Sequence, residues 1–335
     1  MLAKFSIILP VKNGGHYVKE CVESILTQTF TDFDFLVLDN QSTDGTLEWI
    51  QSISDARIKV YPADRPLSIE QNWNRIITIP KNGFITLIGH DDLLNENYLA
   101  TMNDLILKFP DASLYQTHFT YINAQGEKIR DCKVMSEIES AEEFLGKFLR
   151  REIDVMGTGF MMRSQDYDTI GGIPLYPNLL FADFELWIEL ARKSYKATSS
   201  KKCFSFRIHQ STTTISSDIK YHEAFQKFVL FLQRLRKGNQ EFGKVIQSNL
   251  PAFLEFYCKG LSHRLLRTPK EKRNGLSVRK FVFQCKEYAE MLEIGNDFKP
   301  EKIFSIRLAI LIDSNIASRS FFLWFKKIYS KPILK

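Results

Sequence analysis

The sequence predicts an α/β protein with a doubly wound, mostly parallel sheet, followed by a helical C-terminal extension. From residue 5 to residue 123, short continuous apolar runs alternate with segments of helical periodicity. Continuous apolar runs are typical of strands buried on both faces, and strand–helix alternation is typical of parallel sheets. From residue 219 onward, helical periodicity predominates.

The strands and helices of this alternation follow one another in a regular order. FSIILPV (5–11) opens it as a buried strand, and apolar residues at helical spacing follow directly. Thr43 or Asp44 is placed to cap the helix that starts at Thr46. The strands are expected at 5–11, 34–40, 57–62, 84–89 and 113–123, and the helices at 17–28, 46–53, 69–79 and 93–109.

After residue 130 the alternation weakens. We expect there a helix, a strand-like stretch punctuated by glycine, a turn, a second helix and a strand, at 141–151, 155–163, 170–174, 184–193 and 197–208. Four helical segments follow, near 220–237, 241–267, 276–294 and 303–329. The domains expected are one at 1–218, with halves at 1–125 and 126–218, and a basic helical region at 219–335.

Composition and charge are those of a globular protein with an asymmetric charge distribution. Of the 335 residues, 44% are hydrophobic and 25% are charged, which is typical of a folded rather than a disordered chain. Residues 1–218 carry a net charge of −7, whereas residues 219–335 carry +13. The basic region is either a solvated helical surface or a surface that attracts anionic lipid head groups or a phosphorylated acceptor. We expect no nucleic-acid partner.

The five cysteines favour a reducing compartment. Their number is odd, their spacings are wide and no CxxC pair occurs, so we expect free thiols without a metal cluster. The N-terminus enters a strand-like run directly, so we expect no signal peptide. These features predict a cytoplasmic protein, at the inner face of the membrane if the C-terminal region binds lipid.

Polar residues follow three of the predicted strands. They are Lys12 and Asn13 after the first strand, Asp39 and Asn40 after the second, and His90, Asp91 and Asp92 after the fourth. The carboxyl ends of parallel strands meet at one edge of a sheet, where ligands bind. Adjacent carboxylates such as Asp91 and Asp92 repel each other, and a divalent cation would offset that repulsion. The alternative is a helix N-terminus, where the dipole favours Asp.

A series of motifs resembles, in order, the motifs of family 2 glycosyltransferases. FSIILPVKN and SILTQT resemble the strand with P-x-[YF]-N and the S-[IL]-x-x-Q-[TS] motif. VLDNQSTDGT resembles V-D-D-G-S-x-D-x-[ST], and GHDDLL occupies the place of the D-x-D-D segment. IGGIP, ADFELWIELA and FRIHQSTTT resemble I-G-G-[FY], E-D-x-[DE]-L-W and [YF]-R-x-H-x-x-S. Residues 219–335 carry no such resemblance.

The resemblance implies the GT-A fold, in which a nucleotide-binding parallel sheet is joined to an acceptor-binding half. It also implies a nucleoside diphosphate sugar donor, with UDP as the first choice, and Mn²⁺ or Mg²⁺ as cofactor. The residues implied to bind the donor are Pro10, Val11, Asn13, Asp39, Asn72, Asp91 and Arg207. The implied metal ligands are Asp91, Asp92 and His209, and the implied general base is Asp183.

Two positions depart from the family pattern. Gly89 replaces the first acid of D-x-D, and Ala182 replaces the usual Glu before the base. Glu185 is a rival for the role of base, but residues two apart on a helix point about 200° apart, so Asp183 and Glu185 do not face one pocket. We favour Asp183, whose alternative role is that of a helix N-cap.

The sequence therefore predicts an inverting, metal-dependent glycosyltransferase that acts on a glycan or lipid-linked hydroxyl acceptor in bacterial surface polysaccharide synthesis. A metal and an Arg would stabilise the leaving diphosphate while a carboxylate takes the acceptor proton. The alternative is a catalytically inactive nucleotide-sugar-binding module, which Gly89 and Ala182 keep open. A polymerising synthase is disfavoured by the lack of spanning helices. A nucleotidyltransferase is disfavoured by the lack of a glycine-rich basic loop.

The tail, 303–335, is apolar but interrupted by Arg307, Asp313 and Arg319, which makes it a poor transmembrane segment. The run FFLWFKK (321–327) combines aromatic residues and lysines that suit a membrane interface. We therefore expect peripheral membrane contact through this tail. The alternative is a helix packed on the protein or on a second subunit, so a homo-oligomer stays open.

Overall fold

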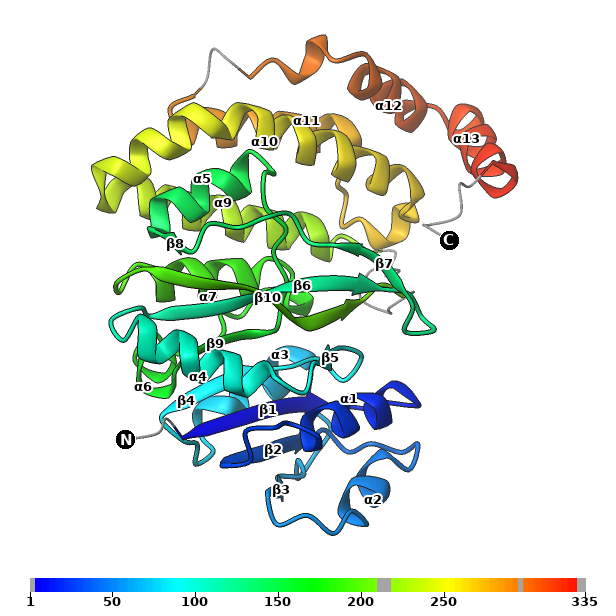
Figure 1. Cartoon of the computed structure of the whole chain (residues 1–335). Helices are drawn as coiled ribbons and strands as arrows, with labels where there is room; N and C mark the ends of the chain where they lie inside the picture. The colour runs from blue at the N-terminus through cyan, green and yellow to red at the C-terminus, as the bar shows by residue number, and fades with distance from the viewer. Residues whose placement is uncertain (1–3, 210–217, 295–297, 330–335) are drawn as a thin grey trace. The chain divides into compact units, whose positions relative to one another are not determined.

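The computed structural model describes residues 4–209, 218–294 and 298–329, and the chain divides into two compact units, Met1–Gln210 and Ser211–Lys335 (Figure 1). Each unit is described by itself. The last part of the predicted FRIHQSTTT motif and the end of the tail, 330–335, lie outside the described residues.

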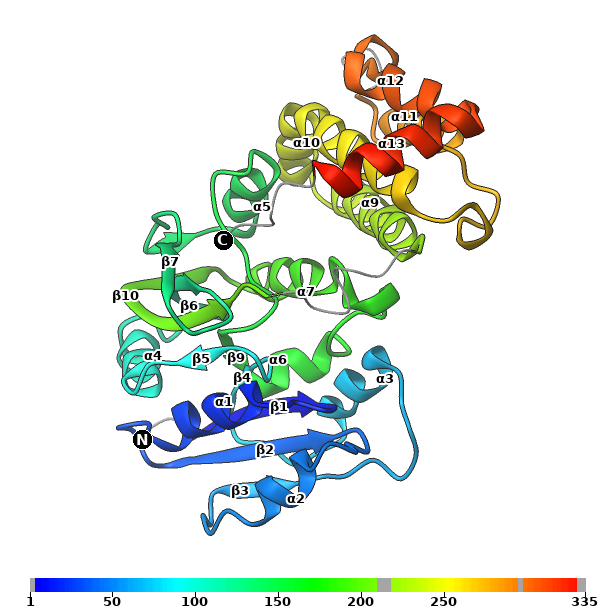
Figure 2. The same ribbon diagram turned by 90° about the vertical axis from the view of Figure 1, so that its right-hand side faces the viewer.

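The first unit is built on one mixed sheet with the strand order β3-β2-β1-β4-β9-β6-β10-β5 (Figures 1 and 2). In addition, β7 pairs with β6 and β8 pairs with β10. The strands are β1 (Phe5–Val11), β2 (Phe33–Asp39), β3 (Ile58–Val60), β4 (Phe84–Leu87), β5 (Leu93–Leu94), β6 (Leu114–Ile122), β7 (Lys128–Asp131), β8 (Ile138–Glu139), β9 (Phe160–Arg163) and β10 (Lys196–Arg207). The first four in chain order, β1 to β4, pair in parallel, with Val11 opposite Asp39 at the carboxyl end. This confirms the parallel half and brings the predicted polar strand ends to one edge.

The strand predicted at 155–163 is shorter than expected and antiparallel. Only Phe160–Arg163 forms β9, which lies antiparallel to both β4 and β6. Gly159 precedes it with φ +78°, and a β-carbon there would meet the Phe204 ring at 2.8 Å. The glycine therefore turns the chain where Phe204 of the long strand β10 comes close.

Helices connect and cover these strands. They are α1 (Tyr17–Leu26), α2 (Thr46–Gln51), α3 (Ile69–Asn74), α4 (Tyr98–Lys108), α5 (Ala141–Leu149), α6 (Ser164–Thr169) and α7 (Ala182–Ala191). The helix predicted to begin at Leu93 begins at Tyr98 instead, because Leu93 and Leu94 pair with β10. Neither Thr43 nor Asp44 is the N-cap of α2, which is Gly45 in the left-handed region; Asp44 accepts a hydrogen bond from the Thr46 N–H from one position before the cap.

Within the described residues, the second unit consists of helices joined by turns and short loops. It contains α9 (Lys220–Gly238), α10 (Gln240–Arg267), α11 (Val278–Met291), α12 (Phe304–Ser314) and α13 (Ile316–Ile328). The single helix predicted at 303–329 is wrong: Asn315 is extended and caps α13 by accepting from the N–H groups of Ala317 and Ser318. Among the described residues, no one helix is long and apolar enough for a membrane span. Only α12 and α13 taken together meet that criterion, and the chain bends by 115° between them.

Candidate active site

The loops after β1 and β2 hold each other in place. Asn13, in the left-handed region at φ 53°, donates its backbone N–H to Ser42 Oγ at 2.9 Å and accepts from the Thr43 N–H at 2.8 Å. Gly14 and Gly15 donate their N–H groups to side chains of the same opposing loop. Pro10 and Val11, which precede this loop at the end of β1, are buried. Asn13 therefore shapes the rim of the sheet edge.

Asp39 ends β2 with one carboxylate oxygen unused. The residue is fully buried, and its Oδ2 accepts from the Ser42 N–H at 3.1 Å. Its Oδ1 is buried and has no hydrogen-bond partner within the described residues. A buried acceptor without a donor is costly, so this atom marks a place where a ligand N–H is expected.

Asn72 is buried and supports this end of the sheet. Its Nδ2 donates to Leu38 O at 3.1 Å, and its Oδ1 accepts from Arg75 at 2.9 Å. Arg75 also donates to the backbone carbonyl of Asp39 and to those of Tyr61 and Pro62. The structure thus places Asn72 as a brace between α3 and β2. Arg75, which the sequence analysis did not identify, fixes the turn that carries Asp39.

Asp91 and His209 meet at the same edge. Asp91 Oδ2 lies 2.7 Å from His209 Nε2, and both side chains are partly exposed. Burial opposes ionisation of Asp91, but the hydrogen bond to His209 and the neighbouring His90 outweigh it and lower its pKa. Burial lowers the pKa of His90 itself. The cluster is a partly open, negatively charged site.

Asp92 points away from solvent. It is 3% exposed, its Oδ2 accepts from the Thr158 hydroxyl at 2.7 Å, and its Oδ1 accepts from the Arg207 N–H at 3.1 Å. Burial, followed by the charge of Asp91, raises the pKa of Asp92 well above its ordinary value. The structure therefore separates the adjacent aspartates: one faces the edge and the other anchors β10 and the loop before β9.

The side chain of Arg207 donates its hydrogen bonds to other groups of the protein. It is 2% exposed and donates Nε to Asp91 O at 2.8 Å, one terminal nitrogen to Glu20 at 2.6 Å and the other to the Ala124 carbonyl at 3.2 Å. Its guanidinium also lies over the Tyr17 ring, 4.6 Å from the centroid. Arg207 thus holds the backbone of the aspartate loop in place. Glu20 and Tyr17 were missed by the sequence analysis because both read as ordinary residues of a helix.

Gly89, the departure from D-x-D, is explained by crowding. A β-carbon at this position would lie 2.7 Å from Asp91 Oδ1 and 3.3 Å from Asp92 Oδ2. Such contacts are closer than packed atoms tolerate. Glycine is therefore the residue that lets the two aspartates fold back over the strand end.

Asp183 lies in the first turn of α7, beside the loop that contacts Asp92. A β-carbon on Gly157 would stand 3.4 Å from Asp183 Oδ2, while the next residue, Thr158, binds Asp92. Burial raises the pKa of Asp183 to about 6, although the backbone N–H groups of Phe184 and of Asp183 itself partly offset this. A carboxyl with a pKa near neutrality is suited to accept a proton.

Glu185, the rival base, is occupied elsewhere. It is buried and hydrogen-bonded to the Tyr176 hydroxyl. It borders a cavity of about 270 Å³ lined by Ile170, Gly172, Pro174, Glu185, Leu186 and Glu189. Glu185 and Asp183 therefore have different surroundings, as their spacing on α7 requires.

The residues present fit a divalent cation only in part. Within 4–209, 218–294 and 298–329, no three His, Cys, Asp or Glu side chains form a ready-made metal site. Mg²⁺ and Mn²⁺ need fewer protein ligands when substrate phosphates and water complete the shell. Asp91 with His209 meets that requirement, whereas both oxygens of Asp92 are already engaged.

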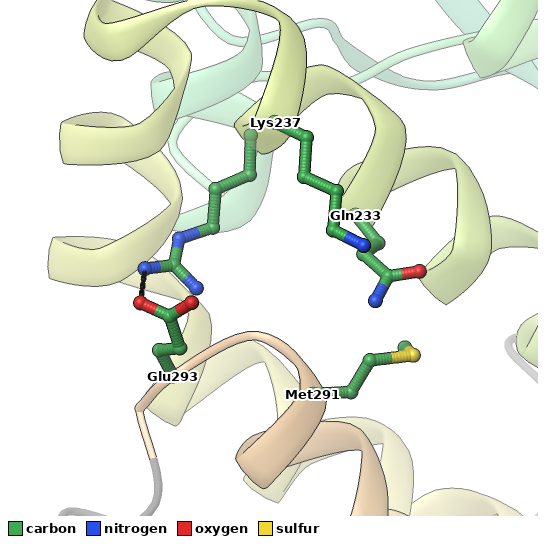
Figure 3. A pocket seen from close by; sticks show the side chains of 5 residues that line it. Gln233, Lys237, Met291 and Glu293 are labelled. Carbon is green, nitrogen blue, oxygen red and sulfur yellow. Dashed lines mark hydrogen bonds and ion pairs between the residues drawn. The ribbon is translucent and has the colours of Figure 1, made fainter.

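A separate concave feature lies within the C-terminal unit, and Figure 3 shows its lining. The cavity, about 150 Å³, is lined by Gln233, Arg236, Lys237, Met291 and Glu293. Glu293 forms an ion pair with Arg236 across it. That pairing neutralises much of its charge, so the polar strand ends of the first unit remain the candidate site.

Relatives with known names support a family assignment. The chain is 28% identical over 123 residues to the glycosyltransferase GlyG of Streptococcus pneumoniae serotype 4, a match covering 36% of this chain and 41% of that protein. It is 24% identical over 227 residues to the GalNAc(5)-diNAcBac-PP-undecaprenol beta-1,3-glucosyltransferase of Campylobacter jejuni, covering 62% and 65%. The matches therefore span less than two thirds of these relatives.

A solved structure shares the fold. TarS 1–349 of S. aureus, crystallised in complex with UDP-GlcNAc, superposes with a TM-score of 0.65 at 12% identity, covering 92% of this chain and 91% of that one. The expected GT-A fold is thereby confirmed. Residues 6–171 match the family model described as glycosyl transferase family 2. Residues 6–171, about half of the chain, are therefore a glycosyl transferase family 2 segment.

Proposed function

We propose that this protein is an inverting glycosyltransferase that uses a nucleoside diphosphate sugar, with UDP as the nucleotide and Mn²⁺ or Mg²⁺ as cofactor. The observation that carries the proposal is the buried, unpartnered Asp39 Oδ1 at the carboxyl end of a parallel strand in a family 2 segment. The imide N–H of a uracil ring supplies the single donor that this atom lacks. The UDP-GlcNAc complex of the fold neighbour TarS supports the choice of UDP.

The diphosphate would lie between the Asn13 loop and the Asp91–His209 pair. A divalent cation bound there supplies neutralisation of the charge that develops on the leaving diphosphate. Arg207 fixes the loop of Asp91 from behind, so that the carboxylate keeps its position at the edge. In this assignment Arg207 and Asp92 position the site, and Asp91 and His209 would hold the cation.

Asp183 is the base of the proposed reaction. An acceptor hydroxyl is a weak nucleophile, and a carboxylate within hydrogen-bond reach takes its proton as the new bond forms. Sugar transfer passes through an oxocarbenium-like state, and a single base on the acceptor side suffices for inversion. The pKa of about 6 for Asp183 leaves it ionised at neutral pH while keeping it basic.

The acceptor proposed is a hydroxyl of a glycan carried on a lipid diphosphate. Support comes from the Campylobacter relative and from an Escherichia coli relative, 29% identical over 103 residues, named a glucosyltransferase for alpha-D-GlcNAc-diphosphoundecaprenol. The protein would then act in the synthesis of a bacterial surface polysaccharide. Five free, buried cysteines support a reducing compartment such as the cytoplasm.

A thermal-shift panel of UDP-, GDP- and dTDP-sugars, with and without Mn²⁺, tests the donor. We expect the largest rise in Tm with a UDP-sugar and Mn²⁺ together, because ligands that bind only the folded state raise its stability. No rise with any nucleotide sugar would refute the proposal. A rise that does not depend on the metal would refute the cofactor alone.

Turnover separates an enzyme from a binding module that has lost catalysis. Wild type should release UDP in the presence of acceptor, whereas Asp183→Asn should keep donor binding and lose turnover. A wild type that binds UDP-sugar but never releases UDP, with any lipid-linked acceptor, would favour the binding module.

A further inference from the structure

The two C-terminal helices expose an unusual amount of apolar surface. On α12, Phe304, Leu308 and Leu311 are exposed at spacings of four and three, so they share one face. On α13, the exposed residues Phe321, Trp324, Phe325 and Ile328 also share one face. Phe321 and Trp324 are 64% and 56% exposed, which is far from a packed core position. Figure 1 shows the two helices as separate elements joined by a bend.

The opposite faces of these helices are firmly anchored. Asp313 of α12 is buried and accepts from Arg273 at 2.6 Å and from the first N–H of α11, that of Val278, at 2.9 Å. Arg319 of α13 donates to the carbonyls of Leu266 and Thr268 at the end of α10. The charges that interrupt the apolar tail thus fix which faces of α12 and α13 point outward.

The charge around the exposed face has one sign. Lys326 and Lys327 are both exposed; Lys327 flanks the apolar stripe of α13, whereas Lys326 shares the face of the anchored Arg319 and lies near His263 of α10. Residues 314–335 contain five Lys and Arg and no Asp or Glu. An apolar stripe with aromatic residues, flanked by lysines, is the pattern of a helix that lies in a membrane interface. A surface that binds a second protein has no general need to lack acidic side chains, whereas a surface that binds anionic lipid does.

We propose that α12 and α13 form a membrane-docking surface whose occupant is a bilayer rich in anionic lipid. The apolar residues of α13 enter the head-group boundary, and Lys327 beside them contacts lipid phosphates. Asp313 and Arg319 hold the helices on the body of the unit, so docking needs no unfolding. The surface binds lipid in the absence of nucleotide sugar, and its test is therefore independent of the proposed catalytic function.

Sedimentation of the full chain with vesicles tests this surface. We expect binding to vesicles with about 30% phosphatidylglycerol, weaker binding to pure phosphatidylcholine, and a loss of binding as salt rises from about 0.1 M to 0.5 M. W324S/F325S should weaken binding at least tenfold, and K327Q should reduce the preference for anionic vesicles. F283S, at a residue 61% exposed on α11, and K237Q/K244Q are matched controls that should retain binding.

Three results would overturn the proposal. One is a wild type that stays in the supernatant with anionic vesicles at low salt. Another is equal loss of binding in F283S and W324S/F325S. The third is a dimer, seen by light scattering, that W324S/F325S dissociates while vesicle binding stays unchanged, because the occupant would then be a second copy. Circular dichroism on each variant shows that the fold is kept.

Discussion

Replacement of Asp183 by Asn should stabilise the protein at alkaline pH while it abolishes the proposed catalysis. Burial raises the pKa of this carboxyl from its ordinary value of 3.8 to about 6. From about pH 4 to pH 6 the folded state therefore holds a proton that the unfolded state has released. The free energy of unfolding therefore falls as pH rises through this window, because the unfolded chain loses the proton of Asp183 at a lower pH than the folded chain does.

The size of the effect follows from proton linkage. One pKa unit corresponds to about 1.4 kcal/mol. Between pH 5 and pH 8 the folded carboxyl gives up its proton near pH 6, so we expect wild type to lose about 1.4 kcal/mol of folding free energy that Asp183→Asn does not lose. Urea denaturation at the two pH values, followed by circular dichroism, measures this difference.

Asp55→Asn is the matched control. The hydrogen bond from Arg57 lowers the pKa of Asp55, so this carboxyl is ionised in both states from pH 5 to pH 8. The difference in stability between Asp55→Asn and wild type should therefore stay constant over that range. If the difference for Asp183→Asn were equally flat, the raised pKa of the Asp183 carboxyl would be refuted. Wild-type turnover should also fall as pH drops through about 6, because the base becomes protonated.

The remaining predictions concern the donor side of the site. Asp39→Asn leaves one side-chain oxygen for two N–H donors, that of Ser42 and that of the uracil ring. UDP affinity measured by calorimetry should therefore fall about 10- to 100-fold without loss of Tm. Unchanged affinity would contradict the role of Oδ1. Gly89→Ala places a methyl group 2.7 Å from Asp91 Oδ1. Mn²⁺-dependent binding of UDP-sugar should therefore weaken at least tenfold, while binding of UDP without metal is retained. Equal loss of both would show a general distortion of the site. Arg207→Lys keeps the charge but loses the planar set of donors, and should lower the free energy of unfolding by about 2–4 kcal/mol. Glu20→Gln, at the partly exposed end of that pair, should cost less than about 1 kcal/mol in the same urea titration.

Periodicity was sufficient for the parallel half of the sheet. FSIILPV became β1 with every residue buried, and the acid that ends the second apolar run, Asp39, lies beside it at the carboxyl end. The predicted elements were least accurate where pairing partners are distant in sequence. Leu93 and Leu94 look like the start of a helix, yet they form a strand with Phe204 and Ser205. Asn315 similarly breaks a helix whose apolar pattern runs on.

Site residues divide in the same way. Asp91, His209 and Asp183 were named from motifs, and the structure brings the first two into contact. Arg207 and Asp92 form hydrogen bonds with the protein, and their expected contacts with donor and metal stay predictions. Glu20 gives no sequence signal, since it reaches Arg207 across 187 positions.

The sequence by itself determined the order of strands and helices, the polar residues at the strand ends and the basic, apolar tail, because each depends on neighbours along the chain. Only the tertiary structure decided which of two adjacent aspartates faces the edge and which is buried. That choice depends on Thr158 and the backbone N–H of Arg207, which arrive from distant segments and satisfy both oxygens of Asp92. A carboxyl group whose two oxygens are already hydrogen-bonded in the interior has few lone pairs free for a ligand. The sequence around Asp92 does not show this, because its partners are distant along the chain.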